Sequence, residues 1–486
     1  MAGTPESPAL RRTLGRWDLT AIGVNQVIGS AIFLLPADVA RLVGPWGPLA
    51  FMADGLLSLS IALCFAEVGS RFEKTGGPYL PARAAFGRFI GFEVGWMMWF
   101  TRVTSQASVA NGLALALAFY WPALATGLSR MSLIAGLTLV LTWINVRGIK
   151  QSSWVVNALT IGKLAPLAIV IIVGVWFVDP ASFAAMPAVT QQQLSSALIL
   201  LIFAYGGYEV TGVLAGEAAN PRRDVPFAFV ATLITVSIVM SLTSLVVTGV
   251  LPDLIASRTP LADSAAIFLG ASGALLVATG VLPDLGASRT PLADGAAIFL
   301  GAAGALLVSM GSAISMAGNN MGQILNGSRT LFALAENGDL PKWFARVHPT
   351  YQTPSNAILF TAVIALTLAL TGSFIALAAV SAIARLVMYL AVCASTLVLR
   401  KHDREIAAQV GPQFPVRRSL GEGGSDLDGA VAPAKFTVPL GPVIPIVASI
   451  VALGILAGAS QAQLIAGAAA LAAGAVLYFV ATRLKM

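Results

Sequence analysis

Asn25–Pro36 reads NQVIGSAIFLLP and lies in an apolar stretch, 18–41, that is long enough to cross a bilayer as a helix. The small residues Gly29–Ala31 (GSA) are followed closely by Pro36, so we expect the helix to unwind at Gly29–Ala31. A helix that is broken inside a membrane leaves backbone N–H and C=O groups that can hold a carboxylate, an ammonium group or an ion. The alternative interpretation is that these small residues serve close helix packing.

A second apolar stretch, 192–216, contains Phe203–Glu209, which reads FAYGGYE. Its adjacent glycines are expected to break the helix. Glu209 lies deep in an apolar run, where an acid is costly and is by default a functional candidate. The alternative is an acid that backbone groups of a neighbouring helix satisfy. The two stretches are the first and sixth predicted spans, which are equivalent positions in a five-plus-five inverted repeat, where a substrate site is expected.

The composition of the 486 residues is typical of a membrane protein: 57% are hydrophobic, only 10% are charged, and the mean hydropathy is +0.84. A soluble protein with so few charges cannot cover its surface with polar groups, whereas lipid suits such a surface. We therefore expect one membrane domain. The net charge of +7 is typical of basic cytoplasmic loops, so the lipid bilayer is the expected partner and nucleic acid is not.

Apolar stretches recur along the chain, and we predict about twelve transmembrane helices. The predicted spans are 18–41, 46–70, 86–119, 131–146, 154–178, 192–216, 226–250, 304–335, 354–372, 374–399, 438–459 and 461–482. The second and third are joined by Ser70–Ala85, in which Thr75–Pro78 (TGGP) is a strong turn signal. With the N-terminus inside, most of the 29 Lys and Arg residues fall in cytoplasmic segments, which predicts cytoplasmic N- and C-termini in the inner membrane.

The connection between helices 7 and 8 carries a tandem copy. Thr248–Ala278 and Thr279–Ser309 are 31 residues each and differ at four positions. If part of this duplication crossed the membrane, every later basic loop would change sides, so we expect it to be extracellular or at the interface. Damage to the protein is the other interpretation. Further on, Gly411–Ala434 is rich in glycine and charge and is predicted to be a disordered cytoplasmic insert.

These features divide the chain into six segments. They are a cytoplasmic N-terminal segment (1–17), helices 1–7 (18–250), the duplication (248–309), helices 8–10 (304–399), a cytoplasmic loop with a polar insert (400–437) and helices 11–12 (438–486).

Three basic residues lie within predicted spans. Lys163, near the start of the fifth span, either reaches to the cytoplasmic interface or is a buried amine that can exchange a proton. Arg102, in the third span, pairs with Glu209 or Glu93, or meets an anionic group of a substrate; we favour a structural ion pair. Arg385, in the tenth span, is interpreted as structural.

Several chemical patterns are missing from the sequence. It has no Gly-x4-Gly-Lys-Ser/Thr phosphate loop, which argues against an ATP-driven pump. His348 and His402 fall in cytoplasmic loops, which disfavours metal or Ser-His-Asp chemistry in the membrane. Cys64 and Cys393 lie in apolar runs and predict packing rather than a disulfide framework or a zinc site. We expect neither an enzyme nor a cofactor.

Several segments together resemble the amino acid–polyamine–organocation (APC) superfamily, and the likeness runs from Trp17 to about Met486. Each segment is weak alone, but their order is highly specific. They are Ile28–Pro36, Ala66–Phe72 (AEVGSRF) leading into Thr75–Tyr79 (TGGPY), Phe86-Gly87 through Gly95-Trp96, Gly206–Glu209 with Gly216–Arg223 (GEAANPRR), and Asn326–Arg329 (NGSR) through Gly338–Pro341 (GDLP).

The resemblance implies a LeuT-type fold of two inverted five-helix repeats and two trailing helices, in which helices 1 and 6 are broken. It also implies which residues bind an amino acid. The substrate's α-carboxylate would be held by Ile28, Gly29, Ser30 and Ala31. Its α-amino group would be received by the backbone carbonyls of Phe203, Ala204 and Tyr205.

The resemblance further assigns a gate and two coupling residues. Phe203 aligns with the aromatic gate over the substrate in arginine/agmatine antiporters, and Glu209 aligns with an acid proposed there to be proton-linked. Lys163 matches a lysine of proton-coupled and exchanger members, whose ammonium group resembles the sodium ion of sodium-coupled relatives. Two features depart from the pattern. Ala31 stands where many relatives have glycine, and the duplication lies directly before the eighth helix, which the family uses to close the ion site.

The sequence therefore predicts an all-α polytopic membrane protein that carries amino acids or related amines by alternating access. It would act as a proton-coupled symporter or as an amino acid exchanger, with an amino acid and protons as its partners. The alternative is a non-transporting membrane sensor, or a permease of the same fold that the duplication has inactivated. A channel is disfavoured because the few intramembrane charges do not line a continuous polar pore.

Overall fold

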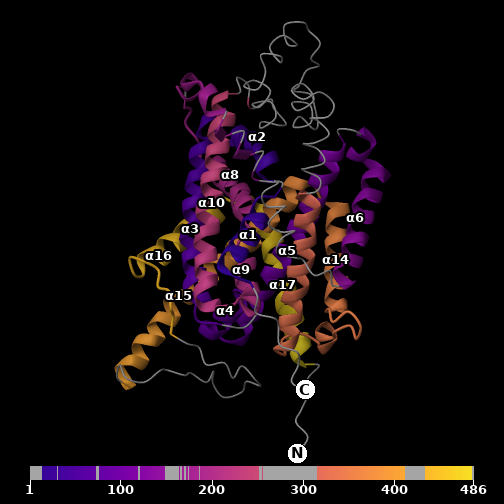
Figure 1. The fold of residues 1–486 in the computed structure, drawn as a ribbon, viewed down its shortest axis with the longest axis vertical. Coiled ribbons are helices and arrows are strands. Elements are labelled where there is room, and N and C mark those ends of the chain that lie inside the picture. The colour runs from indigo at the N-terminus through magenta and orange to yellow at the C-terminus, as the bar shows by residue number, and fades with distance from the viewer. Residues whose placement is uncertain are drawn as a thin grey trace, which may run out of the picture.

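The structure of the chain is a computed structural model that describes residues 14–29, 31–72, 76–118, 121–147, 164, 167–168, 171–172, 174–184, 186–250, 254, 315–410 and 433–483. These residues form helices, turns and one isolated bridge between Leu14 and Ala218, with no strand among them. Figure 1 shows the long helices side by side in one bundle, with the short pieces α1 and α9 near its centre. The all-helical prediction is confirmed for this part of the chain.

The helices have the following bounds. The α-helices are α1 (Arg16–Val27), α2 (Ala31–Val43), α3 (Gly47–Gly69), α4 (Tyr79–Phe86), α5 (Arg88–Leu117), α6 (Gly127–Arg147), α8 (Gln191–Tyr205), α9 (Val210–Val213), α10 (Pro221–Val250), a helix over 315–336, α14 (Ser355–Thr371), α15 (Phe374–Val410), α16 (Val443–Ala457) and α17 (Gln461–Arg483). The 3₁₀ helices are η1 (Gly44–Trp46), η2 (Pro122–Ala125), η3 (Val175–Phe177), η4 (Pro180–Phe183), η5 (Leu214–Glu217) and η7 (Lys342–Ala345).

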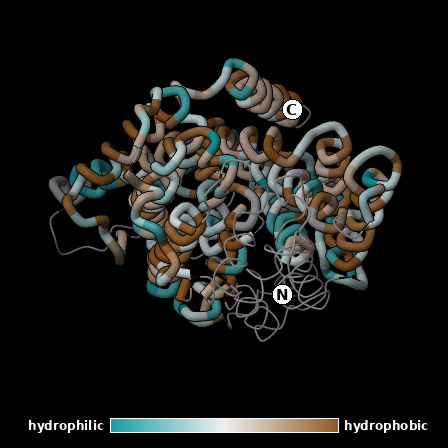
Figure 2. Tube along the Cα trace, turned by 90° about the horizontal axis from the view of Figure 1, so that it is seen from above, coloured by the Kyte–Doolittle hydropathy of each residue, from teal (hydrophilic) through white to brown (hydrophobic). Residues whose placement is uncertain are grey.

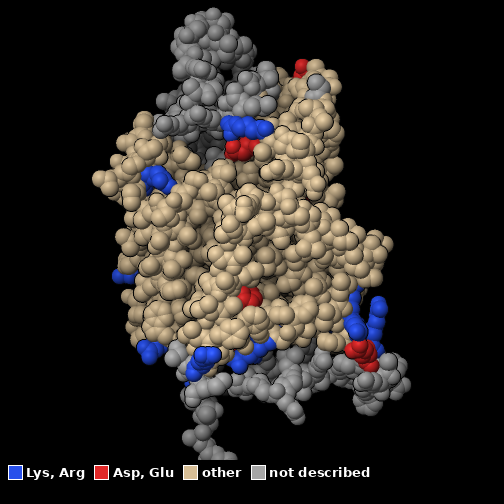
Figure 3. Space-filling view, turned by 180° about the vertical axis from the view of Figure 1, so that it is seen from behind, with Lys and Arg blue, Asp and Glu red and all other residues tan. Residues whose placement is uncertain are grey.

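The outer surface of the bundle suits lipid. Within the described residues, six helical segments are long and apolar enough to cross a bilayer, and α14 and α16 are shorter apolar helices. Large apolar side chains on these helices point outward, such as Leu128 (80% exposed) on α6 and Val476 (61%) on α17. Hydrophobic positions occur all round the bundle in Figure 2, and Figure 3 shows a wide band with few charges above a lower edge where Lys and Arg gather. Soluble proteins rarely expose so much apolar surface, so the chain is a multi-pass membrane protein.

Most predicted spans coincide with helices, but two cannot be compared in full. The fifth, 154–178, lies mainly outside the described residues, and the eighth, 304–335, is described only from residue 315. The duplication (248–309) and the insert (411–434) also lie almost wholly outside them. The count of twelve helices therefore stays a prediction.

Two boundaries differ from the prediction. The helix predicted to end at residue 399 continues in α15 to Val410, because its polar extension is made of helix-forming residues and carries a Lys401–Glu405 pair four residues apart (3.8 Å). Hydropathy marks the membrane boundary, not the end of the helix. The connection Ser70–Ala85 contains the start of α4, which follows directly on the predicted turn, where Gly77 has φ +51°.

Buried acids fasten the ends of several helices. The carboxylate of Glu67, at the end of α3, accepts hydrogen bonds from Arg400 Nε (2.6 Å) and from the Val438 N–H (2.7 Å). The buried Asp339 carboxylate pairs with Arg83 (3.0 Å) and with Arg88 (2.6 Å). These contacts explain why AEVGSRF and GDLP stood out in the sequence: each supplies a buried acid that binds arginines from distant segments.

Candidate functional site

The first helix is broken where the sequence predicts. Helix α1 ends at Val27, and α2 begins at Ala31. The Ile28 N–H donates to the Val24 carbonyl (2.8 Å), which is the last hydrogen bond of the regular helical pattern. The Gly29 N–H donates instead to the Val27 carbonyl (2.8 Å), only two residues before it, so the helix stops here. The break is buried in the bundle.

The second break touches the first. Helix α8 ends at Tyr205, residues 206–209 form turns, and α9 begins at Val210. Gly207 has φ +133°, and a Cβ atom there would lie 2.7 Å from the backbone oxygen of Gln26, near the end of α1. Only glycine permits both this backbone conformation and this approach. The two breaks therefore meet backbone to backbone inside the bundle.

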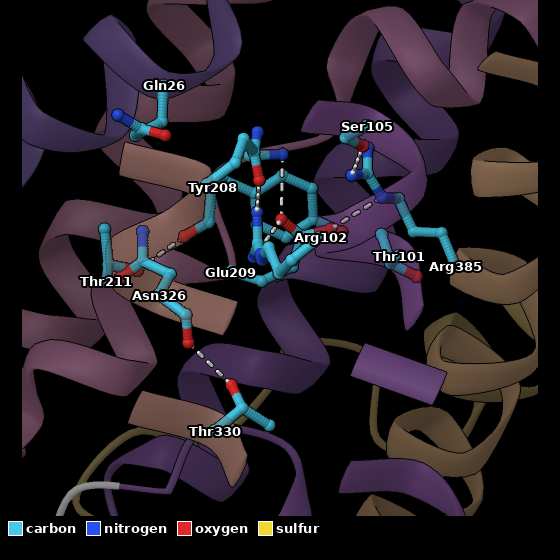
Figure 4. A network of polar contacts seen from close by, with 12 residues as sticks. Gln26, Thr101, Arg102, Ser105, Tyr208, Glu209, Thr211, Asn326, Thr330 and Arg385 are labelled. Atoms are coloured by element: carbon cyan, nitrogen blue, oxygen red, sulfur yellow. Dashed lines mark hydrogen bonds and ion pairs between the residues drawn. The ribbon is translucent and has the colours of Figure 1, made fainter. Parts of the chain in front are cut away.

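Glu209 is the charged centre of this region (Figure 4), and its carboxylate is fully buried. Arg102 Nη2 lies 3.3 Å from Oε2, and Arg385 Nε lies 3.2 Å from Oε1. The Gly207 N–H donates to Oε2 (2.8 Å), and the Tyr389 hydroxyl donates to Oε1 (2.5 Å). Two guanidinium groups and two hydrogen-bond donors stabilise the ionised form of this carboxylate.

Arg385 also caps the end of α8. Its Nη1 donates to the carbonyls of Ile202 (3.4 Å) and Phe203 (3.5 Å), which lie in the last turn of that helix. A cation is favoured at a helix C-terminus. A Cβ atom at Gly206 would lie 1.0 Å from Nη1, so the guanidinium reaches these carbonyls only because this residue is glycine. Together with Arg102, Arg385 outweighs the single charge of Glu209 and leaves a net positive charge, which an anionic group of a ligand would neutralise.

A chain of hydrogen bonds links this charge to the first break. Arg102 Nη1 donates to Gln323 Oε1 (3.4 Å), Gln323 Nε2 donates to Asn319 Oδ1 (3.3 Å), and Asn319 Nδ2 donates to the Gln26 carbonyl (3.0 Å). Because Gln323 and Asn319 belong to the helix over 315–336, three elements share one polar network. If the chain moves at one helix break, the hydrogen bonds that link it to the other helix break must change.

The structure brings most of the predicted site residues together. Ile28, Gly29 and Ala31 are buried at the first break, and Phe203, Ala204 and Tyr205 are buried at the end of α8. The ring of Phe203 meets that of Phe374 edge-on, with centroids 6.1 Å apart. A ligand can reach these residues only if the helices move. Ser30 and Lys163 lie outside the described residues.

The predicted ion pair of Arg102 forms with Glu209, one of the two partners considered. The other, Glu93, has no hydrogen-bond partner for its carboxylate oxygens within the described part of the chain. Arg385, which the sequence analysis interprets as structural, contacts both Glu209 and the Phe203 carbonyl.

Sequence reasoning missed two amides of the network. Asn319 and Gln323 lie one turn apart on one face of an apolar helix, and this polar spacing is a signal that the sequence carries. No sequence pattern pointed to Tyr389, because the residue that it contacts, Glu209, lies 180 positions away in the chain.

Comparisons with known proteins cover nearly the whole chain. A family model described as "Amino acid permease" matches residues 14–481. The chain is 28% identical to the serine/threonine exchanger SteT of Bacillus subtilis (strain 168), over 86% of this chain and 91% of that protein.

Two further relatives come from the same organism. The chain is 25% identical to the branched-chain amino acid permease BcaP, over 99% of this chain and 96% of that protein. It is 24% identical to the methylthioribose transporter, over the same shares of the two chains. The relatives thus differ in the substrates that their names state.

Proposed function

The chain belongs to the amino acid permease family of the APC superfamily, and we propose that it transports amino acids or related amines across the cytoplasmic membrane by alternating access. It acts as a proton-coupled symporter or as an amino acid exchanger. The observation that carries this proposal is the buried contact between the two helix breaks, with Gly207 against the Gln26 carbonyl. Two broken helices that meet inside a membrane protein supply the backbone groups that an amino acid needs.

The substrate lies across the two breaks. Its carboxylate is held by Ile28, Gly29, Ser30 and Ala31, and its amino group by the carbonyls of Phe203, Ala204 and Tyr205. The net positive charge of the arginines beside Glu209 supports the placing of a carboxylate nearby. Because Arg385 already donates to the Phe203 carbonyl, a bound ammonium group takes the place of the guanidinium there or binds beside it. Phe203 is the gate.

Coupling is assigned to Lys163 and Glu209. Lys163 exchanges a proton or serves as a fixed cation in place of a sodium ion. The arginines that flank Glu209 favour its charged form, so protonation of this acid requires that they withdraw during the transport cycle. Such a withdrawal would link proton uptake to the movement of α8 and α9.

The proposed architecture has two inverted five-helix repeats of the LeuT type and about twelve transmembrane helices. Both termini lie in the cytoplasm. The gathering of Lys and Arg along one edge of the bundle in Figure 3 supports this orientation.

The test separates binding from transport. Purified full-length protein is heated with serine, threonine, leucine, isoleucine, valine or methylthioribose, and its midpoint of thermal aggregation is recorded. A bound ligand at about 100 times its Kd stabilises a protein by about 2.7 kcal/mol. Stabilisation by one of these compounds, together with its flux into proteoliposomes, supports the proposal. Stabilisation without flux favours the second candidate, a sensor or a permease that the tandem copy at 248–309 has inactivated.

A further inference from the structure

Asp54, in the first half of α3, is an acid that the site described above does not use. It lies in the apolar run Phe51–Ser60 (FMADGLLSLS) and is fully buried. Neither of its carboxyl oxygens makes a well-formed hydrogen bond among the described residues, and the nearest donor is the hydroxyl of Ser58. An ionisable group this deep in a membrane span is costly and is retained where it serves a function.

The other fully buried acids of the described chain differ from Asp54 in one respect. Glu67, Glu209 and Asp339 each have arginine partners, which compensate their negative charge. Asp54 has no basic partner among the described residues, so no charge pair in this part of the structure explains its presence. A buried carboxylate without a counter-charge or a donor is strongly unfavourable, and such a group becomes neutral by taking up a proton.

Hydroxyl groups lie near Asp54. Ser58 follows one helical turn later and is the donor nearest to Asp54, and Ser237 on α10 lies beside the Tyr205 hydroxyl. Neither Oγ makes a well-formed hydrogen bond within the described part of the chain. A Cβ atom at Gly55 would lie 2.7 Å from Ser237 Oγ and 2.9 Å from the Tyr205 hydroxyl, so the glycine beside Asp54 lets α8 and α10 approach α3 closely. These neutral groups can hydrogen-bond a protonated carboxyl after small movements, but they cannot neutralise a carboxylate.

Within the described part of the chain, the helices that pack against α3 bring no basic side chain next to Asp54. From α8 the titratable neighbour is Tyr205, and from α10 the facing residues are Ser237 and Ser241, which do not titrate. Helix α16 contains no ionisable residue. Helix α15 contacts α3 further along, where Arg400 binds Glu67. On α2, Arg41 pairs with Asp38 (2.5 Å).

Tyr205 connects Asp54 to the part of the molecule that must move. It is the last residue of α8, directly before the second helix break. Its hydroxyl donates to the Phe51 carbonyl (2.8 Å), one turn before Asp54 on α3. If α8 tilts against α3, this hydrogen bond breaks and the space beside Asp54 opens to water.

We propose that Asp54 is a third coupling residue, needed in addition to Lys163 and Glu209: a proton-binding site that couples transport to the proton gradient. Its carboxyl carries one proton in the closed conformation seen here. It releases that proton to water when Tyr205 withdraws, and takes up another in the opposite-facing state. The inference rests on the proposed transport function and names its coupling ion.

The first experiment compares wild type with Asp54→Asn, which keeps the size of the protonated side chain but binds no proton. Full-length protein in proteoliposomes is given radiolabelled serine, threonine, leucine, isoleucine or valine. Exchange against the same internal amino acid is expected to stay within about twofold of wild type. Accumulation driven by a pH gradient is expected to disappear; in wild type one coupled proton gives about tenfold accumulation per pH unit.

Two outcomes of this experiment would overturn the inference. One is pH-driven accumulation by Asp54→Asn at the level of wild type, and the other is wild-type uptake that ignores the pH gradient. If wild type neither exchanges nor accumulates any of the five amino acids, the proposed transport function fails for these substrates. This result differs from failure of the Asp54 proposal, in which wild type transports but the pH gradient or the variant has no effect.

A second measurement needs neither a variant nor transport. Dicyclohexylcarbodiimide adds to protonated carboxyls in apolar surroundings, and mass spectrometry of the labelled wild-type protein locates the adduct. We expect labelling of Asp54 that exceeds labelling of Glu209, whose carboxylate is held by arginines. Asp54 left unlabelled while Glu209 reacts would contradict the inference, even if Asp54→Asn failed to fold.

Discussion

Removal of the charge on Glu209 is the perturbation whose size follows most directly from the structure. In Glu209→Gln, Arg102 and Arg385 lose the carboxylate that lies 3.3 Å and 3.2 Å from them. At an effective dielectric constant of about 20, one such pair attracts by about 5 kcal/mol, and the desolvation of the buried groups offsets part of this. Since two guanidiniums stay buried without their counter-charge, we expect the variant to lose about 3–5 kcal/mol of stability.

The assay is unfolding by SDS in mixed micelles, followed by the fluorescence of the nine tryptophans. Glu93→Gln is the matched control, because it makes the same chemical change at a carboxylate that has no hydrogen-bond partner among the described residues. We expect this control to be at least as stable as wild type, because it removes an unpartnered carboxylate and leaves no cation uncompensated. The double variant Glu209→Gln/Arg385→Gln should be more stable than Glu209→Gln alone, since it removes one of the uncompensated cations. Equal midpoints for Glu209→Gln and wild type would refute the reasoning.

Three further predictions concern other parts of the chain. Gly206→Ala should lower the free energy of unfolding by roughly 1–3 kcal/mol or more and abolish uptake, because its Cβ would lie 1.0 Å from Arg385 Nη1. The control Gly136→Ala, whose Cβ would have no atom within 4 Å, should match wild type in both measurements. Asp339→Asn should lower the free energy of unfolding by about 1–3 kcal/mol in the SDS titration, because the largely buried Arg83 loses its partner, whereas Arg88 is 42% exposed and stays solvated. An unchanged midpoint would show that these pairs contribute nothing. Deletion of 279–309 removes one of two near-identical copies and should leave amino acid uptake at least as high as in the intact chain; lost uptake would show that the second copy is required.

Much of the fold could be predicted because the membrane simplifies the pattern. An apolar run of sufficient length becomes a helix whatever its neighbours are, and small residues such as Gly29 and Gly207 mark where a helix breaks. The end of α15 was placed too early for the same reason. Hydropathy reports contact with lipid, whereas the polar residues after 399 continue the helix through their own helix-forming tendency.

The candidate site was harder to predict, because its chemistry depends on contacts between distant residues. The sequence shows that Glu209 is an acid in an apolar run, but not that two arginines and Tyr389 surround it. Asp54 is also an acid in an apolar run, and the sequence alone does not distinguish it from Glu209. Only the structure shows that arginines compensate the charge of Glu209, whereas Asp54 has no such partner among the described residues.

The central claim, that the chain is an amino acid transporter, is tested most directly by uptake into proteoliposomes. A panel of radiolabelled amino acids is offered with and without a pH gradient and with and without internal amino acid, for wild type and for Lys163→Ala. We expect uptake that follows the pH gradient or the internal amino acid and that changes in the variant. Well-folded protein that moves no member of the panel under any of these conditions would contradict the account.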